Sequence, residues 1–174
     1  MRGGIGVTAA VLVLALAAAA LAASSKGRQG GDGSVAVAAS GNLRIADSRG
    51  ERAILSAPAL APGHPVAGTV TIRNLGAAAG LALSRHRLTE APGAGGRLLG
   101  DALRLTIHRI SDPPGLVYHG PLAAMRPLHL GLLAPGAARS YRFVASLPRP
   151  RRASGALMGA RVRFDYRWRL TPKR

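Results

Sequence analysis

Two stretches of the chain share one pattern, in which a Pro-Gly turn precedes a run of alternating apolar and polar positions. The first stretch covers residues 60–76 and places on one face of its run Val66, Gly68, Val70 and Ile72. The second covers residues 133–148 and places on one face Tyr141, Phe143, Ala145 and Leu147. Because successive side chains of a strand point to opposite faces, each stretch predicts a turn followed by a half-buried strand.

The clearest alternation lies in residues 159–170. One face of this predicted strand is apolar and carries Val162, Phe164, Tyr166 and Trp168. The other face is charged and carries Arg161, Arg163, Asp165, Arg167 and Arg169. Five of the six aromatic residues of the chain fall on this strand and on the strand predicted before it. We therefore expect one aromatic cluster.

Shorter segments complete the pattern. We predict strands over 41–46, 81–88, 103–107 and 116–120, turns over 47–50 and 112–115, and single helical turns within 97–102 and 121–133. About eight or nine short strands joined by Pro- and Gly-rich turns predict an all-β domain, an antiparallel β-sandwich of jelly-roll or Greek-key type. This domain covers residues 41–170 and is followed by a basic tail over 171–174.

The first 23 residues have the pattern of an export signal. Arg2 supplies a positive charge, residues 5–21 are apolar, and residues 20–22 form a small-x-small site for a signal peptidase. We predict a signal helix over 1–23 that is cut near Ala22 or Ala23, so that the mature protein is secreted or lies on the cell surface. The alternative is an uncleaved membrane anchor. Residues 24–40 begin Gly-rich and polar, which predicts a flexible tether.

The charge of the chain is strongly positive, at +17, and nearly all of it comes from arginine. Arginine binds phosphate and carboxylate groups in a bidentate manner, so we expect an anionic cell-wall polymer, an acidic polysaccharide or extracellular DNA as partner. The alternative is a solvated surface whose arginines reflect GC-rich codons. The candidate residues precede or form the last strand: Arg149, Arg151, Arg152, Arg161, Arg163, Arg167 and Arg169.

Several segments together resemble the TasA/camelysin family of secreted bacterial β-sandwich proteins. These segments are GNLRI at 41–45, LAPG at 60–63, GTVTIRN at 68–74, LRLTI at 103–107 and LAPG at 133–136. The resemblance implies a jelly-roll-like domain and a structural role in fibres of a biofilm matrix. It also implies growth of a homo-polymer by strand donation, for which residues 34–39 are the candidate donor, with Val35 and Val37 as its plug residues. The alternative is that this segment pairs within its own chain or stays disordered.

The sequence predicts no catalytic site and no cofactor. Cysteine is absent, which excludes thiol catalysis, cysteine-ligated zinc and disulfides. The chain has no His-Glu-x-x-His motif and no Gly-x-Ser-x-Gly elbow. A metal-dependent peptidase, an activity reported for camelysin, stays as a remote alternative that would need tertiary clustering of scattered histidines: His64, His86, His108, His119 and His129.

Overall fold

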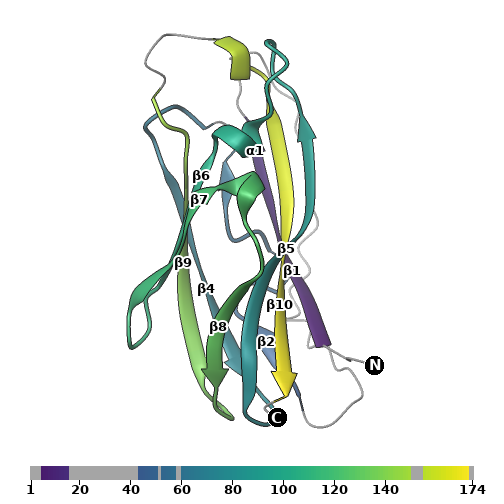
Figure 1. The fold of residues 1–174 in the computed structure, drawn as a ribbon, viewed down its shortest axis with the longest axis vertical. Helices are drawn as coiled ribbons and strands as arrows, with labels where there is room; N and C mark the ends of the chain where they lie inside the picture. The colour runs from purple at the N-terminus through teal and green to yellow at the C-terminus, as the bar shows by residue number, and fades with distance from the viewer. Residues whose placement is uncertain (1–4, 16–42, 51, 58–59, 150–154, 173–174) are drawn as a thin grey trace.

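The computed structural model is mostly antiparallel β and contains two five-stranded sheets (Figure 1). It describes residues 5–15, 43–50, 52–57, 60–149 and 155–172. The first sheet has the order β3-β1-β10-β5-β8, formed by β3 (Ser56–Ala57), β1 (Ile5–Ala15), β10 (Arg161–Pro172), β5 (Ala79–Ala91) and β8 (Leu128–Leu133). The second has the order β2-β4-β9-β6-β7, formed by β2 (Ile45–Asp47), β4 (Val66–Asn74), β9 (Ala138–Ser146), β6 (Arg104–Arg109) and β7 (Gly115–Pro121).

In the described part of the chain three short helical turns connect these strands, namely α1 (Leu99–Ala102), η1 (Leu122–Ala124) and η2 (Gly155–Leu157). The first two confirm the helical turns predicted within 97–102 and 121–133. The strands predicted over 81–88, 103–107, 116–120 and 159–170 are also confirmed, with ends that differ by a few residues. Strand β8 was missed, because its sequence LHLGLL places leucine on both faces and its glycine is atypical of a strand interior.

The two turn-and-strand units pair with each other. Strands β4 and β9 are antiparallel neighbours, with Val70 opposite Tyr141. In each preceding turn the glycine has a positive φ, 81° at Gly63 and 71° at Gly136, which is the conformation that a Pro-Gly turn requires. The amide of Gly63 donates to the carbonyl of Leu147, and the amide of Gly136 donates to the carbonyl of Asn74, each over 2.8 Å. Each turn therefore covers the end of the other unit's strand.

The predicted aromatic cluster joins the two sheets. Tyr141 and Phe143 of β9 meet Trp168 and Tyr166 of β10, with ring centroids 5.3 Å apart for Tyr141–Trp168 and 4.8 Å apart for Phe143–Tyr166. Phe164 stacks edge-on against Tyr166 at 4.7 Å. These five side chains are at most 1% exposed. The apolar faces predicted for the last two strands are thus confirmed as the centre of the core.

Strand β1 takes the place of the helix that we expected in the signal segment. Its register with β10 runs antiparallel from Ile5 opposite Leu170 to Ala15 opposite Arg161, with one irregularity near Ala9. Isoleucine, valine and threonine are frequent in this segment, and these residues favour strands. In the described part of the chain, no helix is long and apolar enough to cross a bilayer. Cleavage near residue 22 stays a prediction, and residues 24–40, with Val35 and Val37, lie outside the described residues.

Candidate functional site

The outer face of the first sheet carries a row of arginines, which we call the arginine face. Four of its members alternate along β10 with the buried aromatic residues, and the fifth comes from β5: Arg161, Arg163, Arg167, Arg169 and Arg87. Arg167 is half-buried and the other four are exposed. Alternate residues of a strand lie about 7 Å apart, so the row on β10 extends over roughly 27 Å. A row of this length fits a linear ligand better than a small ion.

Little negative charge balances the arginine face. Asp165 is the one carboxylate in the outward row of β10; it pairs in register with Arg87, and its Oδ1 is buried without a hydrogen-bond partner among the described residues. Arg167 donates from Nη2 to Nε2 of the exposed His86 over 2.7 Å. A hollow of about 330 Å³ lies beside Arg163 and Thr89 on this face. The face can therefore offer cationic donors to phosphate, sulfate or carboxylate groups.

The other predicted arginines do not extend this row. Arg149 follows β9 in the second sheet, and its side chain packs against Gly63 in the turn before β4. Arg151 and Arg152 lie outside the described residues. Sequence reasoning missed Arg87, because the irregularity at Asp165 in the pairing of β5 with β10 shifts the alternation of β5 there.

The histidines do not form a metal centre in the described residues. His86 accepts from Arg167, and Nδ1 of His119 lies 3.0 Å from the hydroxyl of Thr106. His64 and His108 are exposed at separate places on the second sheet and its turns. Among the residues that the structure describes, no group of three or more histidine, aspartate or glutamate side chains could hold a metal ion.

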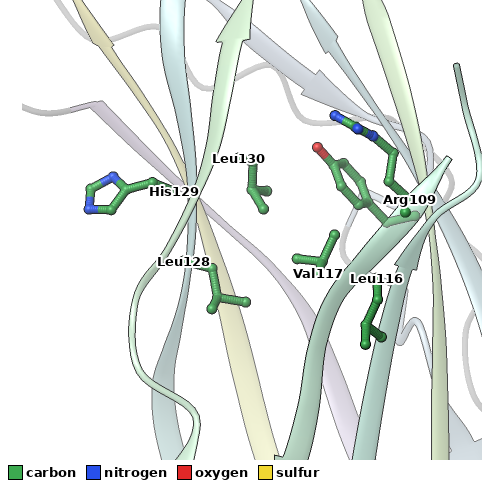
Figure 2. Close-up of a pocket in the computed structure, with 8 residues that line it drawn as sticks. Arg109, Leu116, Val117, Leu128, His129 and Leu130 are labelled. Atoms are coloured by element: carbon green, nitrogen blue, oxygen red, sulfur yellow. The ribbon is translucent and has the colours of Figure 1, made fainter. Parts of the chain in front are cut away.

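A second candidate is a pocket at the side of the molecule where the edge strands of the two sheets, β7 and β8, lie (Figure 2). We call it the edge pocket. Its volume is about 260 Å³, and it is lined by Arg109, Gly115, Leu116, Val117, Leu128, His129, Leu130 and Tyr141. Figure 2 shows Leu128 and Leu130 pointing from β8 toward Val117, while the ring of His129 points away on the other side of the strand. The pocket therefore combines apolar side chains with polar groups.

Two buried polar atoms belong to residues that line the pocket. Arg109 follows Leu105 and Ile107 at the inward positions of β6, and it lies opposite Tyr141 of β9 in register. Nε of Arg109 is buried without a hydrogen-bond partner among the described residues, and the buried hydroxyl of Tyr141 has no acceptor there for its proton. Burial raises the pKa of Tyr141, while the guanidinium of Arg139, which lies close enough to donate to the hydroxyl oxygen, and the charge of Arg109 lower it by less. Tyr141 is therefore a neutral hydrogen-bond donor at neutral pH.

The edge pocket was not predicted from the sequence. Tyr141 was assigned correctly to an inward face, but only as a core residue. One signal was available: extending the inward series Leu103, Leu105 and Ile107 by one step places Arg109 at an inward position. An arginine there is unusual, because charged side chains are seldom buried without a partner.

Comparison with known proteins gives no relative. No family model, no curated protein and no solved structure matches the chain.

Proposed function

We propose that the chain is an exported, non-catalytic structural protein of the cell surface or extracellular matrix that holds a linear anionic polymer on its arginine face. In this proposal the two sheets form a β-sandwich of jelly-roll type. The observation that supports it is the row of four arginines on β10, extended by Arg87, with Asp165 as the one carboxylate in the outward row of that strand. The net charge of +17 adds a long-range attraction to any polyanion.

Binding of duplex DNA at several salt concentrations tests this proposal. Each phosphate contact contributes about 0.9 to the slope of log K against log salt, so four arginines account for a slope of about 3 to 4. Changing Arg161, Arg163, Arg167 and Arg169 together to Ser should weaken binding and reduce the slope by up to that amount.

A matched control removes the same charge from the second sheet and the residues beside it. Arg44, Arg73, Arg104 and Arg142 are exposed, and changing all four to Ser lowers the net charge equally. If the arginine face binds the polymer, this control should keep most of the affinity. Equal losses in the two variants would mean that only net charge matters, and the proposal would be wrong.

The position of β1 supports a second candidate, a fibre subunit that assembles by strand addition. Strand β1 pairs with β10 along nearly its whole length and with β3 over two residues only. If the leader is cut near Ala22, as we predict, β10 loses this neighbour and becomes an open edge. An open edge is a template for a strand from another molecule. The candidate donor is residues 34–39, with Val35 and Val37.

Electron micrographs of chains that begin at residue 24 and at residue 40 test this candidate. Fibres that form only from the longer chain indicate strand donation by the segment that the shorter chain lacks. Fibres from neither chain, or from both, would exclude that segment as the donor. The DNA experiment is independent of this result, because the arginine face is present in both chains.

A further inference from the structure

We propose that the edge pocket binds a small organic carboxylate with an apolar body. This inference concerns a site separate from the arginine face. Arg109 and Tyr141 belong to the second sheet, and the pocket opens toward edge strand β8 of the first sheet. The arginine face lies on the outer side of β10 and β5.

The polar groups of the pocket are donors without an acceptor. The guanidinium of Arg109 is permanently charged, and its Nε is buried without a partner among the described residues. The hydroxyl of Tyr141 is buried beside it, its proton has no acceptor in the described part of the chain, and burial keeps it protonated. Of the residues that the structure describes, no aspartate or glutamate lines the pocket. A planar carboxylate accepts hydrogen bonds from a guanidinium and a hydroxyl together, and it would satisfy both groups.

Arg139 is not the cation that binds the carboxylate, although its guanidinium also lies near Tyr141. Its Nη1 donates to the carbonyl of Leu130 over 2.6 Å, and its Nη2 donates to the carbonyl of Leu132. Arg139 therefore ties β9 to the edge strand β8 and has fewer donors left. Arg109 is the cation of the pocket that remains available for a ligand.

The walls and the volume limit the ligand. Leu116, Val117, Leu128 and Leu130 supply apolar surface, and Leu116 is 63% exposed at the mouth. The volume of about 260 Å³ is slightly below the usual range for drug-sized ligands. An aromatic or short aliphatic acid fits these limits, whereas a polymer does not. Inorganic sulfate or phosphate would satisfy the donors and leave the apolar walls uncovered.

A second buried tyrosine hydroxyl, that of Tyr166, provides a control for the change of Tyr141 to Phe. The hydroxyl of Tyr166 is also buried without a partner among the residues that the structure describes, but Tyr166 lines neither the edge pocket nor the hollow beside Arg163. A change of Tyr166 to Phe therefore removes the same atom from the core and leaves the edge pocket unaltered. It is the matched control for the same change at Tyr141.

Titration calorimetry of the full chain with benzoate and hexanoate tests the proposal. We expect both acids to bind. Benzyl alcohol should bind at least about tenfold more weakly, because it lacks the charge whose hydrogen bonds contribute a factor of this size. Sulfate should also bind at least about tenfold more weakly, because it buries no apolar surface of the pocket. Tyr141→Phe should lose about tenfold in affinity for benzoate, and Arg109→Met should lose about a hundredfold. Tyr166→Phe should bind as the parent does.

Any one of three results would overturn the proposal. The first is the absence of any heat of binding with benzoate up to about 20 mM. The second is an affinity of Arg109→Met for benzoate equal to that of the parent, and the third is sulfate binding as tightly as benzoate. Benzoate binding that disappears when Arg161, Arg163, Arg167 and Arg169 become Ser would assign the acid to the arginine face. Thermal unfolding of every variant confirms that it is folded, and Tyr141→Phe keeps the test valid if Arg109→Met does not fold.

Discussion

Single residues of this protein combine deep burial with unsatisfied polar atoms. The hydroxyls of Tyr141 and Tyr166 and Nε1 of Trp168 are buried, and their protons have no acceptor among the described residues. Their rings nevertheless form the centre of the core, because an aromatic ring buries a large apolar area. Each unsatisfied hydroxyl opposes this stabilisation by about 1–3 kcal/mol.

Tyr166 gives a prediction on pH. Burial raises the pKa of its hydroxyl well above 10, whereas the tyrosine of the unfolded chain ionises near its ordinary value of 10.0. Above pH 10 the unfolded state therefore releases a proton that the folded state retains, and stability falls as pH rises. The loss due to this group is about 1.4 kcal/mol per pH unit until the folded pKa is reached.

Urea unfolding at pH 8 and pH 11 measures this effect. The parent should lose more free energy of unfolding between the two pH values than Tyr166→Phe loses. At pH 8 the variant should be as stable as the parent or more stable, because it lacks an unsatisfied hydroxyl. The same pH dependence in both proteins would contradict the assignment.

Strand β4 of the second sheet contains one position, Gly68, where another part of the backbone comes very close. Ile54 lies against β4, and a methyl group added to Gly68 would overlap its carbonyl group. The alternation of β4 predicts correctly that position 68 lies on the inward face. It does not predict which segment packs there, because the contact joins residues from separate parts of the chain.

Gly68→Ala should therefore destabilise the protein by more than about 2 kcal/mol, since backbone atoms must move to admit the methyl group. Gly80→Ala is the matched control, because Gly80 also lies in a strand and its added methyl group would meet only the carbonyl oxygen of Thr171, at 3.7 Å. The control should change stability by less than about 1 kcal/mol. Urea unfolding compares the two, and similar losses would show that the close approach at Gly68 is not decisive.

The whole molecule carries 24 lysines and arginines and only 7 acidic residues. Even if every acidic residue formed an ion pair, 17 cations would remain unbalanced. Such a net charge destabilises the compact state through self-repulsion, which salt screens. Ionic strength should therefore raise the stability of this protein.

Thermal unfolding in sodium chloride tests this expectation. Between about 20 and 300 mM salt we expect the unfolding temperature to rise by about 3 °C or more, which corresponds to about 1 kcal/mol for a domain of this size. The variant with Arg161, Arg163, Arg167 and Arg169 changed to Ser should show a smaller rise, because it has less charge to screen. A fall in the parent's unfolding temperature would mean that specific ion pairs outweigh the repulsion.

The sequence alone determined the local features of the protein. Alternation identified β4, β9 and β10, and the turn predicted at 47–50 forms because Oδ1 of Asp47 accepts from the amides of Arg49 and Gly50. The outward arginines of β10 were identified in the same way. These features depend on residues close together in the chain, so a short window of sequence contains the physical information that specifies them.

Only the tertiary structure decided which elements meet. It paired the two turn-and-strand units, placed Ile5–Ala15 beside β10 as a strand, and separated Arg149 from the arginine face. It also brought Arg109 and Tyr141 together beneath an edge strand that the sequence did not reveal. These arrangements depend on contacts between distant segments, and local alternation shows which face of a strand is buried but not what covers it.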